Sequence, residues 1–387
     1  MDKISIDIKI INNLKLILKN FSQSNGNKPQ FNKLYHFNIQ RENFPLPQLI
    51  FFILAKILRF KYYHHLEKIL WLIPFYFNEH YCEISLRKFG LRLDVFTSNK
   101  NDDIENIKEK IISKLNKASY LIEKKVLNSF ANNQLEDGDF TIQNQYIEFT
   151  SMYNYFRENA DNFFKLSLKK QDKSDNFSET INTINQKLKS QKKAYYNAFS
   201  MIDTFYSRLE HLFVLSLAFL NFNPSRINVK EFIFKNWSDK YKDIFDISSD
   251  SKAKMFYDEL KEIKEKYRNT KSHGGFDKEA SSIYFHLPEV GAISCSLSKY
   301  NKSLTFNFIP FDINSFKNIC SVFDEFDTWL DKSKLKYAVL YIKTGLDVPF
   351  DKDSILKHNI AIKNEKSFND LIEERAYFED LYTNMDF

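Results

Sequence analysis

Residues 199–220, FSMIDTFYSRLEHLFVLSLAFL, carry the clearest structural pattern in the sequence. Apolar side chains recur there at every third or fourth position. They are Phe199, Ile202, Tyr206, Leu209, Phe213, Leu217 and Leu220. This spacing places them on one face of an α-helix, which is stable in water mainly when that face is buried. The segment therefore predicts a long helix whose apolar face packs against other helices of a helical domain.

Two later segments show the same spacing. The first has Phe256, Leu260, Ile263 and Tyr267, and the second has Phe316, Ile319, Phe323, Phe326 and Leu330. Three helices with matching stripes predict a bundle. Between these two segments, SSIYFHLPE, AISCSLS and SLTFNFIP each alternate apolar and polar residues. They predict a small antiparallel meander inserted at about residues 281–310.

The sequence on either side of the bundle predicts a mixture of elements. The apolar residues 49–77 predict two buried helices, and CEISLRKFGLRLDVF predicts a hairpin. Residues 104–130 and the segment YIEFTSMYNYFRENADNFF have helical periodicity. Near the end, YAVLYIKT predicts a strand and residues 367–382 predict a helix. The sequence assigns no chemistry to the N-terminal part.

The predicted fold is therefore mainly α, of the α+β class. A chain of 387 residues is too long for one small core, and the polar run KKQDKSDNFSE suggests a boundary near residue 170. We expect a mixed but mostly helical N-terminal region at 1–170 and a helical bundle with its β insertion at 175–335. A strand–helix extension at 336–387 completes the chain.

The composition favours a cytoplasmic protein without metal or cofactor. Cys82, Cys295 and Cys320 are odd in number and lack the spacing of metal ligands, so we expect no disulfide and no zinc site. The N-terminus lacks the apolar core of a secretory signal, and the most apolar run, LIFFILAKIL, is about half the length that spans a bilayer. The net charge of +6 permits a polyanionic partner without requiring one.

Residues 264–279, KEKYRNTKSHGGFDKE, gather side chains suited to phosphate chemistry. Arg268 has a permanent charge and a planar fork for phosphate oxygens. His273 titrates near neutral pH and can carry a proton. The glycines that follow leave room for a substrate backbone. The same residues also suit an ordinary helix end, where glycine stops the helix and basic groups complement its dipole.

The run YRNTKSHGG resembles the R-N-x-x-x-H signature of the HEPN superfamily, and DTFYSRLEHLFVLSLAF resembles the helix that precedes that signature. The resemblance covers about residues 180–335, although the inserted meander is not part of a minimal HEPN bundle. It implies cleavage of RNA without a metal, by attack of the ribose 2′-hydroxyl on its own phosphate. Arg268 and His273 match the catalytic pair. Asn269 would orient the arginine or bond the scissile phosphate, and Lys271 would contact the substrate.

The resemblance also implies a homodimer. Residues five apart lie about 140° apart around an ideal helix, so one Arg–His pair clasps a phosphate poorly. In HEPN enzymes two motifs face each other, which implies a two-fold dimer with a composite active site. The rival arrangement pairs the motif with Arg59 and His64 of the same chain. That copy has the same spacing but carries Phe60 in place of the asparagine, and we expect it to pack at the edge of a core.

Glu210 is the supporting residue expected beside the motif. It lies one position off the apolar stripe of the long helix, with Asp203 two turns earlier on the same side. Either carboxylate is able to pair with Arg268 and aim it, and we favour Glu210 because the resemblance places this helix beside the motif. The neighbouring His211 is expected to be structural.

Three functions are compatible with this pattern. The first is an endoribonuclease acting as a toxin or anti-phage defence effector, which implies an antitoxin or another regulatory partner. The alternative is a HEPN module that binds nucleotide or RNA without cutting it. The third is a structural interaction protein in which Arg268 and His273 only end a helix. No membrane association is expected in any of them.

Overall fold

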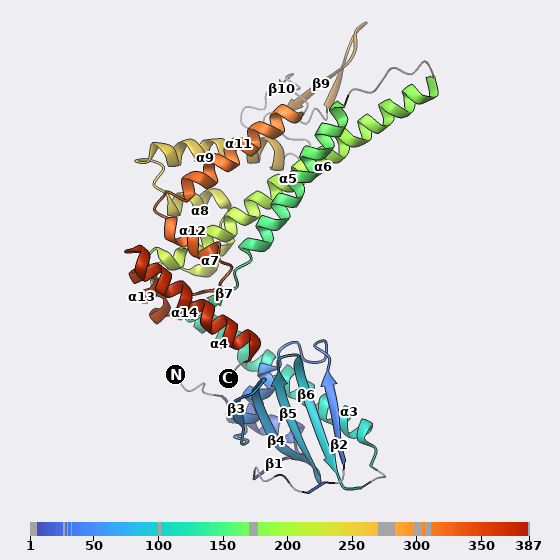
Figure 1. Ribbon diagram of the computed structural model, residues 1–387, viewed down its shortest axis with the longest axis vertical. Helices are drawn as coiled ribbons and strands as arrows, with labels where there is room; N and C mark the ends of the chain where they lie inside the picture. The colour runs from blue at the N-terminus through green and yellow to red at the C-terminus, as the bar shows by residue number, and fades with distance from the viewer. Residues whose placement is uncertain are drawn as a thin grey trace. The chain divides into compact units, whose positions relative to one another are not determined.

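The computed structural model describes residues 6–25, 28, 30–31, 33–99, 102–169, 177–269, 283–297, 304–305 and 311–385 (Figure 1). For Arg268 and Asn269 the description covers the backbone alone. The chain forms two compact units. Unit 1 comprises Met1–Asp137 and Glu373–Phe387, and unit 2 comprises Gly138–Ile372. Helices outnumber strands across the two units, which confirms the predicted mainly α, α+β class.

Unit 1 is built on a six-stranded antiparallel sheet in the order β1–β4–β5–β6–β2, and β3 also pairs with β4. The predicted hairpin is confirmed as β5 and β6, which are joined by a turn at Lys88 and Phe89. The strands are β1 (Phe21–Gln23), β2 (Lys33–Ile39), β3 (Tyr63–Leu66), β4 (Ile69–Phe77), β5 (His80–Arg87) and β6 (Gly90–Thr97).

The prediction of two helices over residues 49–77 is half wrong. The first half is helical, as α2 (Gln48–Phe51) and the π-helical η1 (Phe52–Ile57), but residues 69–77 form strand β4. In β4, Trp71 and Ile73 face the core, while Leu72 and Pro74 lie on the other face. Apolar residues on both faces hide the alternation that marks a strand.

Helices cover one face of this sheet. They are α1 (Ile8–Ile17), α2, η1 and α3 (Ile104–Ile122), the last of which lies behind the strands in Figure 1. Ile111 and Leu115 of α3 are fully buried there. The helix predicted over 104–130 is confirmed, and it continues through η2 (Glu123–Leu127) and α4 (Asn128–Asp137). Helical residues outnumber strand residues over 1–170, as expected, although a sheet organises unit 1.

Unit 2 contains the predicted bundle. Its long helices are α5 (Tyr146–Leu168), α6 (Phe177–Ser216), α9 (Ser251–Ile263) and α11 (Ile313–Leu330). α6 continues as the 3₁₀ turn η3 (Leu217–Phe219), and the short helices α7 (Val229–Phe234) and α8 (Trp237–Ile244) follow it. Phe205 of α6 stacks on Phe323 of α11, with ring centroids 3.6 Å apart. The three predicted helices are therefore confirmed, with their stripes packed together.

The predicted boundary near residue 170 differs from the observed division. It falls between α5 and α6, which run antiparallel and side by side within unit 2 (Figure 1). Tyr153 of α5, for example, contacts Phe205 of α6 with ring centroids 6.0 Å apart. The polar run at 169–179 therefore connects two helices of one unit, and the units divide between Asp137 and Gly138.

The predicted meander is confirmed as β8 (Ile283–Leu287), β9 (Gly291–Leu297) and β10 (Leu304–Thr305), in the order β10–β9–β8.

The strand predicted at YAVLYIKT is wrong, because this run is helix α12 (Lys336–Ile342). Its buried residues, Ala338, Val339, Tyr341 and Ile342, have helical spacing and pack beside α6. A short apolar run does not by itself separate a buried strand from a buried helix.

The remaining elements complete the chain. β7 (Thr141–Ile142) pairs with β11 (Val348–Pro349), and α13 (Lys352–Ala361) precedes α14 (Glu365–Asn384). α14 confirms the helix predicted near the end of the chain. Among the described residues, no helix combines the length and the apolarity needed to cross a lipid bilayer.

The stack between α6 and α11 provides a test of the bundle. We expect Phe323→Ala to lower the free energy of unfolding of unit 2 by about 3–5 kcal/mol, because a fully buried ring is lost and a cavity remains. Urea unfolding followed by tryptophan fluorescence measures this change, since Trp237 and Trp329 both lie in unit 2. The control Phe234→Ala removes a ring that is 87% exposed and should change stability by less than about 0.5 kcal/mol. Equal effects would contradict the packing described.

Candidate functional site

The helix that leads into the predicted motif is α9. Asp250 caps its start by accepting hydrogen bonds from the backbone N–H groups of Lys252 and Ala253, at 2.9 and 3.0 Å. After Ile263 the helix widens into the π-helical turn η4 (Lys264–Asn269), whose last two residues are Arg268 and Asn269. Such π-helical turns are rare and occur often at functional sites. The start of the motif therefore lies on an ordered, packed helix.

α9 and η4 run antiparallel to α6. The hydroxyl of Tyr206 donates a hydrogen bond to the backbone carbonyl of Leu260. Farther along, Tyr267 contacts the ring of Phe311 at 5.2 Å, and Phe311 also contacts Phe199 of α6 at 6.3 Å. Residue numbers thus rise along η4 as they fall along α6. The C-terminal end of η4 is therefore closer to Phe199 than to the C-terminal half of α6.

Glu210 stabilises the turn that immediately precedes the motif. Its carboxylate accepts a hydrogen bond from Lys240 Nζ at 3.1 Å and forms an ion pair with Lys264 Nζ at 3.8 Å. The side chain of Lys240 is only 3% exposed, so its ammonium needs this partner. Lys264 also lies over the rings of Tyr206 and Trp237, at 5.1 and 5.4 Å.

The structure does not test the expected pairing of Glu210 with Arg268, because the side chain of Arg268 is outside the description. The described partners of Glu210 are the two lysines, and Lys264 precedes Arg268 by one helical turn. Sequence reasoning missed both lysines, because their approach to Glu210 depends on how α8 and α9 pack on α6.

The rest of the predicted site lies outside the described residues. Lys271 and His273 fall in the segment 270–282, and the side chains of Arg268 and Asn269 are not described. The structure thus places the backbone of two motif residues on the last turn of a packed helix. The arginine–histidine pairing stays a prediction.

The second Arg–His copy lies at the edge of the unit 1 core, as expected, because Phe60 within it packs against that core. Arg59 follows η1 with a left-handed φ of 63°, and His64 lies on β3 of unit 1. Both side chains are exposed, although the ring of His64 contacts Phe51 at 4.9 Å. The prediction that this copy lies between two helical runs is wrong, since strands follow it.

His211 has a structural role, as expected. Its Nε2 accepts a hydrogen bond from the backbone N–H of Gln145 at 3.0 Å, which ties α6 to the start of α5. Burial lowers the pKa of His211 to about 4. The neutral ring is the form that accepts this bond.

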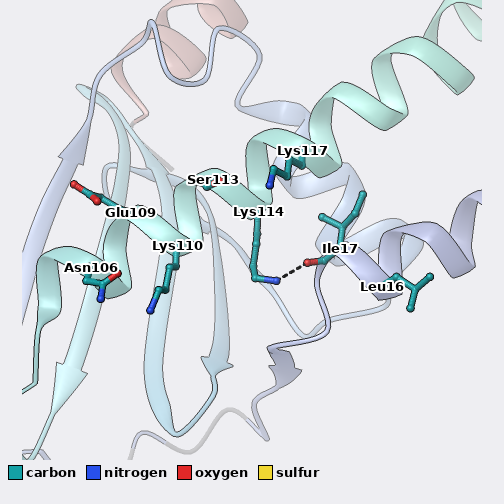
Figure 2. A pocket seen from close by; sticks show the side chains of 8 residues that line it. All are labelled: Leu16, Ile17, Asn106, Glu109, Lys110, Ser113, Lys114 and Lys117. Carbon is teal, nitrogen blue, oxygen red and sulfur yellow. Dashed lines mark hydrogen bonds between the residues drawn. The ribbon is translucent and has the colours of Figure 1, made fainter.

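A second charged feature lies in unit 1, in a cavity of about 620 Å³ between α1 and α3. Figure 2 shows Lys114 extending to the backbone carbonyl of Ile17, which accepts its hydrogen bond at 2.9 Å. Lys110 and Lys117 also line the cavity, with a single carboxylate from Glu109. Burial and the charges of Lys19 and Lys117 lower the pKa of Lys114. The cavity is basic, and sequence reasoning did not single it out.

Comparison with known proteins finds no family model, no curated protein and no solved structure that matches the chain. Within the described ranges, no group of three or more His, Cys, Asp or Glu side chains is placed to hold a metal ion.

The hydrogen bond of His211 leads to a prediction about pH. Above pH 6.5 the ring is neutral in both the folded and the unfolded chain. Below pH 6.5 the unfolded chain takes up the proton first, because the folded pKa is about 4. We expect wild type to lose stability faster than His211→Gln between pH 6.5 and 4.5, by roughly 1 kcal/mol per pH unit.

Urea unfolding at several pH values measures this difference. The matched control is His286→Gln, which changes an exposed histidine of β8 and should keep the wild-type slope. Parallel pH profiles for wild type and His211→Gln would show that the hydrogen bond to Gln145 does not depend on a neutral ring.

Proposed function

We propose that this chain is a metal-independent endoribonuclease of the HEPN type, with its reactive residues in unit 2. The observation that carries the proposal is the packing of the motif helix. Arg268 and Asn269 belong to η4, which packs against the long helix α6, and the sequence resemblance places that helix beside the motif. Glu210 and Lys264 stabilise the turn before them.

The proposed chemistry needs a proton carrier and a fixed positive charge. His273 takes the proton of the ribose 2′-hydroxyl or delivers one to the departing 5′-oxygen. Arg268 stabilises the charge that builds on the phosphate, and Asn269 orients the guanidinium or bonds the phosphate. The 2′-oxygen forms a bond to phosphorus as the bond to the 5′-oxygen breaks. The products are a 2′,3′-cyclic phosphate and a 5′-hydroxyl, and Lys271 contacts the strand.

A second copy of the chain would complete the site. One Arg–His pair on a helix diverges by about 140°, and a two-fold dimer brings two pairs to a shared cleft. We propose a homodimer with a composite active site. The proposed setting is the cytoplasm, where the enzyme acts as a toxin or anti-phage effector and an antitoxin or regulatory partner restrains it.

Matched variants test the proposal. We expect Arg268→Ala and His273→Ala each to slow cleavage of single-stranded RNA by at least about 100-fold, because each removes a group that acts in the transition state. The measurement is the rate of product formation by purified protein in the presence of EDTA. The control Arg59→Ala/His64→Ala removes the same two residue types at the same spacing and should leave the rate within about twofold.

Three results would change the conclusion. A His273→Ala protein as fast as wild type would exclude the proposed mechanism. An equal loss in the Arg59→Ala/His64→Ala variant would favour pairing of the two motifs within one chain. A wild-type protein that binds RNA but yields no product would support the non-catalytic HEPN module.

A further inference from the structure

The sheet of unit 1 has one face that the helices leave uncovered. The buried side chains of its strands point toward α1, α2, η1 and α3. Strand alternation places Arg87 of β5, Arg92 and Asp94 of β6, and His36 of β2 on the opposite face. We call these four side chains the arginine face. They come from three neighbouring strands and lie close enough to bond one another.

A buried carboxylate organises the arginine face. The side chain of Asp94 is only 4% exposed, and its Oδ1 lies 2.7 Å from both Arg92 Nε and His36 Nδ1. Its Oδ2 lies 3.5 Å from a terminal nitrogen of Arg87. Arg87 Nε also donates a hydrogen bond to Ser85 Oγ at 3.0 Å. These bonds hold both guanidinium groups in fixed orientations.

The outer edges of the same groups face solvent. The side chains of Arg87, Arg92 and His36 are 30%, 25% and 49% exposed, while the carboxylate lies beneath them. A guanidinium has five N–H donors, and the bonds to Asp94, Ser85 and His36 use only part of them. Fixed donors that point outward are the arrangement that binds an anion with little ordering cost.

The arginine face carries more positive than negative charge. Within it, one carboxylate faces two guanidinium groups. The neighbouring carboxylate, Glu83, accepts a hydrogen bond from the hydroxyl of Tyr81 at 2.9 Å and pairs with Lys28 at 3.5 Å. Burial and the nearby charge of Arg92 lower the pKa of Arg87. The carboxylates of Asp94 and Glu83 act in the opposite direction on the same pKa.

The net charge of the chain points to the same region. Residues 1–137 contain 21 Lys and Arg against 14 Asp and Glu, a net charge of +7. Residues 138–387 contain 35 against 36, a net charge of −1. The C-terminal segment of unit 1, residues 373–387, has one basic and five acidic residues and leaves the unit at +3. The positive excess thus lies in the segment that builds the sheet.

Aromatic side chains border the arginine face. At one end Phe31 contacts the rings of Tyr81 and Phe96, at 5.7 and 5.4 Å. At the other end Phe89, in the turn between β5 and β6, is 97% exposed. This turn joins the two strands that carry Arg87 and Arg92. Aromatic rings beside fixed arginines are typical of surfaces that stack unpaired bases and bind the intervening phosphates.

We propose that the arginine face binds the phosphodiester backbone of a single-stranded nucleic acid, with Phe89 stacking on a base. A single strand fits better than a duplex, because an exposed ring stacks on a base only when that base is unpaired. The inference does not depend on the ribonuclease proposed for unit 2. It assigns nucleic-acid binding to the N-terminal part of the chain.

The test measures binding separately from cleavage. The probe is a fluorescently labelled single-stranded DNA of 12 nucleotides, which lacks the 2′-hydroxyl and so resists the proposed cleavage. Fluorescence anisotropy gives its affinity for the full chain at several salt concentrations. The variants are Arg87→Gln/Arg92→Gln and Phe89→Ala. The control Lys110→Gln/Lys117→Gln removes the same charge from α3, the helix on the opposite face of the sheet.

We expect the double arginine variant to weaken binding at least about tenfold at 0.1 M salt. It should also reduce the slope of log K against log salt by about 1.4, since each phosphate contact on a single strand contributes about 0.7. Phe89→Ala should weaken binding by about fivefold or more. The lysine control should change affinity by less than about threefold.

Two outcomes would overturn the inference. Equal weakening by the lysine control would show that only net charge matters. Binding within twofold of wild type in the double arginine variant would show that the arginine face is a structural ion-pair cluster. Circular dichroism checks folding, and adding Asp94→Asn to the double variant removes the carboxylate that would otherwise be buried without its partners. If neither multiple variant folds, Phe89→Ala decides alone.

Discussion

The hydrogen bond from Tyr206 to the carbonyl of Leu260 fixes how far α9 extends along α6. Both residues are fully buried, so the bond lies where an unmade partner would be costly. The same carbonyl also accepts the backbone N–H of Lys264, the first residue of the π-helical turn. The carbonyl of Leu260 therefore accepts two donors just before the helix widens. The position of Arg268 one turn later depends on this contact.

In each unit a carboxylate holds basic side chains in place. In unit 2 Glu210 pairs with Lys240 and Lys264, which are themselves largely buried. In unit 1 the buried Asp94 holds Arg87 and Arg92, whose outer edges reach solvent. In both places a carboxylate fixes basic groups without cancelling their charge.

The sequence predicts the bundle well because its helices bury one stripe each. Apolar spacing fails to identify strand β4, which contains Trp71, because both faces of that strand are apolar. Ion pairs between distant segments leave no local pattern. Lys240 reaches Glu210 across 30 residues, and His36 reaches Asp94 across 58. The sequence shows that Arg92 and Asp94 lie on the same face of a strand. It does not show that His36 joins them, because that contact depends on the pairing of β2 with β6.

We propose that the 2′-hydroxyl of RNA attacks its own phosphate beside the motif that begins on η4. Mass spectrometry of the ends formed from a defined RNA oligonucleotide, incubated with the protein in EDTA, tests it most directly. We expect upstream fragments that end in a 2′,3′-cyclic phosphate and downstream fragments that begin with a 5′-hydroxyl. Fragments that carry a 5′-phosphate, or an RNA that stays intact, would contradict it.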